Sequence, residues 1–236
     1  MAYKRPLQMS KSESKKPVIY VHAKGHGSVD ASTVQQLLKT GLPVCSHLER
    51  EGLTKTENSY AQRGLLITEL AGLFPGRPII FLRAGLQPSD QLLDRLSGLL
   101  EGLDQPVAVS VLSNADIRVN PFAGLQAPSE ALDCEPGELV QLLAPGQMHE
   151  LTSWTDHFVL LSSELVDRLS SNAPDDELMH CLRAAGSKLV VADHFFLHDP
   201  HSRIFAPIKL QPHESAYPPP FGELSARLQR WYKACL

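Results

Sequence analysis

Short apolar runs alternate with amphipathic stretches along most of this chain. The apolar runs predict buried strands over residues 18–23, 43–48, 78–82, 107–112, 158–161 and 188–197. Between them, apolar positions recur at helical spacing, which predicts helices over 28–41, 58–73, 92–100, 138–143, 164–169 and 175–186, with a last helix over 223–234. Strands that alternate with helices in this way favour an α/β fold with a mostly parallel, doubly wound sheet flanked by helices.

The pattern divides the chain into three parts. Residues 1–16 are polar and rich in lysine and arginine, so we expect a disordered lead-in, with contact to an anionic membrane surface as the alternative. Residues 17–211 carry the strands and helices of one domain, and residues 212–236 form a proline-rich linker and a C-terminal helix. Leu224, Leu228 and Trp231 give that helix an apolar face, which a partner protein or a second copy of the chain could cover.

Composition changes this picture little. The chain has 236 residues, 43% of them apolar and 20% charged, which is typical of one globular domain with a full core. A net charge of −4 gives no reason to expect nucleic acid as the main partner. The sequence shows neither a signal peptide nor an apolar run that could span a bilayer, and its four cysteines have no CxxC spacing. We therefore expect a cytoplasmic protein with no transmembrane segment.

The candidate chemistry is concentrated near residues 175–198. Asp175, Asp176 and Glu177 open a predicted helix that ends at Gly186, and the apolar strand after it ends at His198. Carboxylates at a helix N-terminus are stabilised by the helix dipole and are placed to take a proton from an acceptor hydroxyl. The simpler interpretation is a helix cap followed by a core strand.

Five segments in order give the chain a resemblance across roughly residues 18–205 to the family 2 glycosyltransferases of the GT-A fold. Residues 27–32 (GSVDAS) are similar to the family's NGSxDGT turn, and residues 52–58 to its NxGfaxAxN segment. Residues 81–90 (FLRAGLQPSD) stand where the family has its metal-binding DxD, residues 113–121 are similar to its SN…P loop, and residues 158–168 to its later hairpin and helix.

The resemblance implies transfer of a sugar from a nucleotide-diphosphate sugar to an acceptor hydroxyl on a saccharide, a lipid-linked glycan or a protein, in the assembly of surface polysaccharide. It implies that Asp176 or Glu177, with Asp175 beside them, is the catalytic base, and that His198 is a late metal ligand. The donor-side positions it implies are Gly25, Ser28, Asn58, Arg83, Ser113 and Asn114.

The sequence departs from the family at the donor side. Arg83, Ala84 and Gly85 stand at the DxD position, so the carboxylates that would hold Mn²⁺ or Mg²⁺ are missing and a divalent cation is doubtful. Gly25 stands where the family has a base-contacting aspartate, and the family's usual first strand has no counterpart in residues 1–16. This leaves two hypotheses. Arg83 neutralises the diphosphate in a metal-independent enzyme, or the domain is a non-catalytic binding or scaffolding module.

Other side chains allow two interpretations each. Trp154 and His157 precede a predicted strand and could stack on an acceptor sugar, although core packing explains the tryptophan equally well. His194, His198 and His201 could suggest a zinc site, but residues four apart on a strand lie roughly 13 Å apart. A histidine-rich strand end at the edge of a cleft is the alternative.

Overall fold

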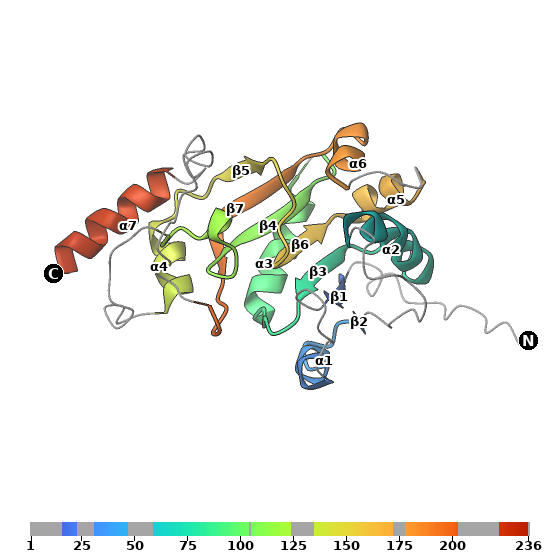
Figure 1. The fold of residues 1–236 in the computed structure, drawn as a ribbon, viewed down its shortest axis with the longest axis horizontal. Coiled ribbons are helices and arrows are strands. Elements are labelled where there is room, and N and C mark those ends of the chain that lie inside the picture. The colour runs from blue at the N-terminus through green and yellow to red at the C-terminus, as the bar shows by residue number, and fades with distance from the viewer. Residues whose placement is uncertain are drawn as a thin grey trace, which may run out of the picture.

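The computed structural model describes residues 16–22, 31–46, 59–103, 105–123, 135–171, 178–202 and 222–235, and they form an α/β fold (Figure 1). One seven-stranded sheet has the order β2-β1-β3-β6-β4-β7-β5. Its strands are β1 Val18–His22, β2 Val44–Ser46, β3 Ile79–Arg83, β4 Ala108–Ser113, β5 Met148–Leu151, β6 Phe158–Leu161 and β7 Leu189–Leu197.

The sheet is mixed, and parallel strands make up most of it. Strand β1 pairs in parallel with β2 and β3, and β4 pairs in parallel with β7. Strand β6 is antiparallel to both β3 and β4, so it joins the two parallel groups and makes their strands run in one direction. Strand β5 is antiparallel to β7 at the edge of the sheet. The predicted α/β class is therefore correct, with β5 and β6 as antiparallel members that the alternation did not reveal.

The helices agree closely with the predicted ranges. They are α1 Ala31–Leu38, α2 Ser59–Leu73, α3 Asp90–Glu101, α4 Pro136–Leu143, α5 Ser163–Ser171, α6 Leu178–Ala184 and α7 Gly222–Cys235. Local chemistry fixes several ends. Ser89 caps α3 by accepting a hydrogen bond from the Leu92 N–H, and Gly186, with φ of 69°, makes the turn from α6 into β7.

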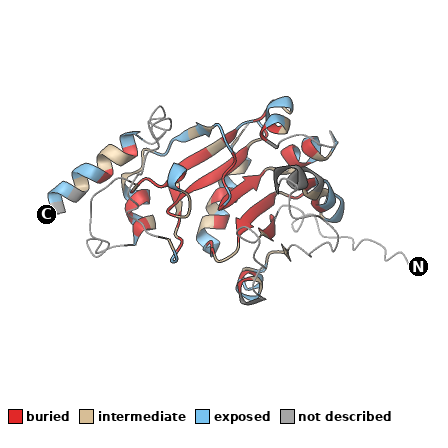
Figure 2. Cartoon of the chain, in the orientation of Figure 1, coloured by how far each residue is buried: buried red, intermediate tan, exposed pale blue. Residues whose placement is uncertain are grey.

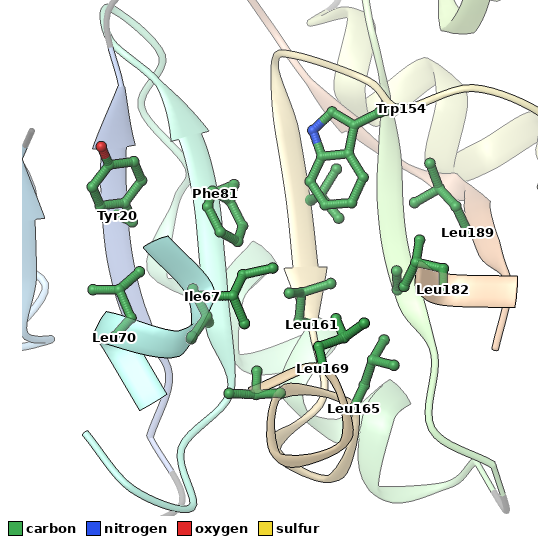
Figure 3. Packing of buried hydrophobic residues seen from close by; sticks show 14 of the residues in the cluster. Tyr20, Ile67, Leu70, Phe81, Trp154, Leu161, Leu165, Leu169, Leu182 and Leu189 are labelled. Atoms are coloured by element: carbon green, nitrogen blue, oxygen red, sulfur yellow. The ribbon is translucent and has the colours of Figure 1, made fainter. Parts of the chain in front are cut away.

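Strand alternation divides the core into two layers, one on each face of the sheet. Ile79 and Phe81 of β3 belong to a cluster that α2, α5 and α6 cover, whereas Ile80 and Leu82 belong to a cluster that α1 and α3 cover. Figure 3 shows the first cluster. Phe81 of β3 and Ile67 of α2 belong to it, and Leu182 of α6 lies farther along the same face of the sheet. The central strands are buried almost throughout (Figure 2), as strands covered on both faces must be.

The C-terminal helix α7 docks on the chain itself. Leu224 and Leu228 are buried in a third cluster with Leu139 and Val140 of α4. Arg227 adds a hydrogen bond of 3.0 Å from Nη1 to the carbonyl of Leu143, at the end of α4. Thus α4 covers the apolar face for which the sequence suggested a partner, while the far end of α7 projects from the body (Figure 1).

The predicted domain boundaries meet the described residues only in part. Residues 1–15 and 203–221, which hold most of the lead-in and the proline-rich linker, lie outside them. Among the helices that the structure describes, none combines the length and apolar character needed to cross a membrane.

Candidate functional site

Three strands bring predicted site residues to the carboxyl edge of the sheet, which is the side where the parallel strands end and not the outer strand β5. Strands β3, β4 and β7 run in the same direction and end at Arg83, Ser113 and Leu197. Asn114 comes directly after β4, and His198 and Asp199 come directly after β7. The carboxyl edge of the parallel strands is where open α/β sheets bind their ligands. Arg83, Ser113 and Asn114, predicted as donor-side residues from separate motifs, thus lie at the carboxyl ends of these strands.

A buried ion pair lies at the centre of this edge. Arg83 Nη2 lies 2.7 Å from Asp199 Oδ2, and both side chains are less than a tenth exposed. The second terminal nitrogen, Nη1, donates to the carbonyl of Ala115 at 3.3 Å. Breaking a buried pair of this kind by removing one partner typically costs about 3–5 kcal/mol, because an uncompensated charge is left behind. The pair therefore holds the ends of β3 and β7 together.

Asp199 is held from several sides. Its Oδ1 accepts a hydrogen bond of 2.9 Å from the His201 N–H, and Oδ2 accepts one of 2.7 Å from Ser202 Oγ in addition to that from Arg83. Burial works to raise the pKa of this carboxyl group. The hydrogen bonds from Ser202 and His201 and the charge of Arg83 outweigh burial and hold the pKa of Asp199 below its usual value. Asp199 is therefore an anion at neutral pH.

Ser113 and Asn114 fasten the backbone of the same turn. Asn114 Nδ2 donates to the carbonyls of Asp199 and Ser202 at 2.7 and 2.8 Å, and its Oδ1 accepts from the Asp199 N–H at 2.7 Å. Ser113 Oγ donates to the carbonyl of Leu197 at 2.6 Å and accepts from the Ala115 N–H at 3.0 Å. These hydrogen bonds of Ser113 and Asn114 thus go to backbone groups of the chain and hold the turn after β7.

His157 fills the space left where β6 stops short of the edge. Strand β6 is antiparallel to its neighbours, so its first residue, Phe158, lies towards the carboxyl ends of β3 and β4. Between Phe158 and these strand ends, no strand separates β3 from β4. The backbone carbonyl of His157 accepts a hydrogen bond of 3.0 Å from the Arg83 N–H, and its Nε2 lies 2.8 Å from the carbonyl of Val111. Because the Val111 carbonyl is an acceptor, Nε2 carries the proton and Nδ1 is an unprotonated acceptor.

The environment keeps His157 neutral. The side chain is fully buried, and burial, reinforced by the charges of Arg83 and Arg118, lowers its pKa from 6.5 to about 4. The hydrogen bond to Val111 and the charge of Asp116 oppose this shift without cancelling it. Nδ1 is buried and has no hydrogen-bond partner within the described parts of the chain. The imidazole is therefore uncharged at neutral pH.

Trp154 and His157 are core residues in this structure. Trp154 is 2% exposed and packs edge to face against Phe81, with ring centroids 5.9 Å apart (Figure 3). Its neighbour Thr155 bonds through Oγ1 to Ser110 Oγ at 2.8 Å, which adds a buried polar contact to β4. Neither ring has an open face on which an acceptor sugar could stack.

The remaining predicted residues lie outside the described residues: Gly25, Ser28, Asn58, Asp175, Asp176 and Glu177. The elements after the acidic cluster are those predicted. Helix α6 starts at Leu178, the chain turns at Gly186, and β7 then runs to Leu197, the residue before His198. Met179 and Leu182 of α6 share a cluster with Phe81, so α6 lies on the side of the sheet that Phe81 faces.

The residues at this edge do not fit a divalent cation. His198 and Asp199 are adjacent, but the Asp199 carboxylate is bound to Arg83, whose guanidinium would repel a dication. Nowhere in the described ranges do three His, Cys, Asp or Glu side chains gather as a ligand set, so His194, His198 and His201 do not form a zinc site there. Asp193 instead binds the Gln147 N–H at 2.8 Å and His149 Nε2 at 3.2 Å.

Two acidic residues near these strand ends, Asp199 and Asp116, were not assigned to the site from the sequence. Asp199 pairs with Arg83 across 116 positions, and a single sequence holds no signal for a contact that distant. Asp116 pairs with Arg118 near the same edge, with 2.5 Å between Oδ2 and Nη2. Burial acts to raise the pKa of Asp116, but the hydrogen bond and charge of Arg118 outweigh burial and lower that pKa.

Comparisons with known proteins add little to this geometry. No protein-family model matches the chain, and no curated protein matches it. Among solved structures, one that resembles it is that of A197 from STIV, with a TM-score of 0.41 and 11% sequence identity. The alignment covers 76% of this chain and 82% of that chain. A likeness at this level gives no information on the activity of this protein.

Proposed function

We propose that this chain is a glycosyltransferase of the GT-A type that uses Arg83, in place of a metal ion, to neutralise the diphosphate of a nucleotide-sugar donor. The observation that carries the proposal is the position of Arg83 at the carboxyl edge of the sheet, beside Ser113 and Asn114. A guanidinium is always charged and pairs in bidentate fashion with phosphate oxygens, so it can stabilise a departing diphosphate without a cation.

The proposed base is Asp176 or Glu177, with Asp175 beside them. These residues directly precede α6, and α6 packs on the face of the sheet to which Phe81 of β3 points. In the reaction, the carboxylate would take the proton of the acceptor hydroxyl as its oxygen attacks the sugar, and the nucleoside diphosphate would leave.

A second candidate function is a glycosyltransferase-like binding or scaffolding module without catalysis. It is favoured by the ion pair itself, since Asp199 already neutralises Arg83 and both are buried. In that case the Arg83–Asp199 pair is purely structural, and the edge of the sheet has lost its donor site.

Calorimetric titration with UDP, GDP and dTDP sugars, with and without Mn²⁺, separates the two functions. The transferase is expected to bind one of these nucleotides at micromolar concentration, with an affinity that Mn²⁺ leaves unchanged. Release of nucleotide should then be lost in Glu177→Gln or Asp176→Asn, while circular dichroism shows an unchanged fold. Absence of binding under every condition would contradict the transferase and favour the second candidate.

A further inference from the structure

We propose that Asp199, in the turn after β7, is an internal occupant of an oxyanion site on Arg83, so that its carboxylate is an autoinhibitory latch that an incoming oxyanion displaces. The inference rests on the proposed role of Arg83, but it concerns how that site is controlled. One carboxylate oxygen, Oδ2, accepts a hydrogen bond of 2.7 Å from Nη2 of the buried Arg83 guanidinium, at a position that an oxygen of a phosphate group could take.

The charges around the pair suit an exchange of anions. Guanidinium carries five N–H donors, and two hydrogen bonds from the Arg83 guanidinium are seen among the described residues, to Asp199 and to Ala115. The His201 N–H and Ser202 Oγ also donate to the Asp199 carboxylate, so removal of that carboxylate leaves these donors beside the positive charge of Arg83. An oxyanion with several oxygens, such as a diphosphate, can satisfy more of these donors than one carboxylate.

The latch can open without unfolding the turn. Asn114 holds the backbone of Asp199 and Ser202 through three hydrogen bonds that do not involve the Asp199 carboxylate. Rotation of the Asp199 side chain would break its hydrogen bonds with Arg83, the His201 N–H and Ser202 Oγ. The three hydrogen bonds from Asn114 to the backbone would remain. Asn114 is thus a fixed support, and the carboxylate is the movable part.

The test is calorimetric titration of the full chain with inorganic pyrophosphate. Asp199→Asn keeps the shape of the side chain but removes the competing charge, so pyrophosphate should bind about tenfold more tightly or better than to the wild type. Asp116→Asn is the matched control, because it removes one negative charge from an ion pair close by and leaves Arg83 with its partner. The affinity of this variant for pyrophosphate should stay within about twofold of the wild type, because the hydrogen bond from Arg83 to Asp199 is unchanged.

Three results would overturn the latch: no gain in Asp199→Asn, an equal gain in Asp116→Asn, or a gain that persists in the double variant Arg83→Met/Asp199→Asn. If Asp199→Asn does not fold, Ser202→Ala weakens the latch without unpairing a charge, and it should shift pyrophosphate affinity in the same direction by a smaller factor. Wild-type affinity in a folded Ser202→Ala would then refute the proposal. Because pyrophosphate carries no sugar, the latch can hold even where nucleotide-sugar transfer is absent.

Discussion

Acidification should destabilise this protein through one buried imidazole, that of His157. Its pKa is about 4 in the folded chain, against the ordinary value of 6.5. Above pH 6.5 both the folded and the unfolded states hold it neutral. As the pH falls from 6.5 towards 4, the unfolded chain takes up a proton that the folded chain refuses, so stability is lost. At roughly 1.4 kcal/mol per pH unit, this window amounts to about 3 kcal/mol.

Urea unfolding between pH 7 and pH 4, for the wild type and His157→Gln, measures this effect. Glutamine can place its amide N–H near the position of Nε2 and keep the bond to Val111, but it does not titrate. The difference in unfolding free energy between the two proteins should therefore change by about 3 kcal/mol over this range. His180→Gln, which replaces an exposed imidazole on α6, is the control. Parallel curves for the wild type and His157→Gln would refute the burial argument.

Two further predictions concern the core. Trp154→Ala should cost about 3–5 kcal/mol in urea unfolding, because it empties the space beside Phe81, and a loss under about 1 kcal/mol would contradict its place in the core. Leu228→Ala should cost about 2–5 kcal/mol if α7 is integral to the fold, and amide exchange should rise first in α7. Arg230→Ala, on the exposed side of α7, is the control, and equal exchange in both variants would count against the docking on α4.

The layers of this fold could be predicted from the sequence because burial depends on local periodicity. The continuous run 158–161 is buried at every position and gives β6 its full length, and Gly186 marks the turn between α6 and β7. Strand β5 was missed for the same reason. Met148 and Glu150 are exposed, so the strand alternates over only four residues at the edge of the sheet. Such a pattern does not differ from that of a loop.

The candidate site was predictable only in part. Arg83, Ser113 and Asn114 could be grouped only through the resemblance, and the structure has them at the carboxyl ends of strands that run in one direction. Their partners could not be predicted, since the bond from Arg83 to Asp199 depends on how turns from distant strands meet. The same holds for the irregular pairing of β7, where the partners of Val111 and Leu112 are Ala192 and Phe196, and Asp193 falls in the interruption.

The burial of His157 and Trp154 illustrates a second limit. Both precede β6 and could as well have lined a surface as filled the core. His157 is buried because β6 starts only at Phe158, so the residue before it bonds to both β3 and β4, and Trp154 is buried because it packs on Phe81 in the cluster on one face of the sheet. The order of strands in the sheet decides this, and a single sequence does not encode that order in any local pattern.

Release of nucleoside diphosphate from UDP, GDP and dTDP sugars in the presence of a chelator, compared between the wild type and an Arg83 variant, tests the central claim most directly. If Arg83 replaces the metal, the wild type should turn over one donor at the same rate with chelator as with Mn²⁺. The variant Arg83→Met/Asp199→Asn, which removes both charges of the buried pair and leaves neither unpaired, should remain folded and lose that activity. Turnover that requires Mn²⁺, or that survives in the folded double variant, would contradict the account.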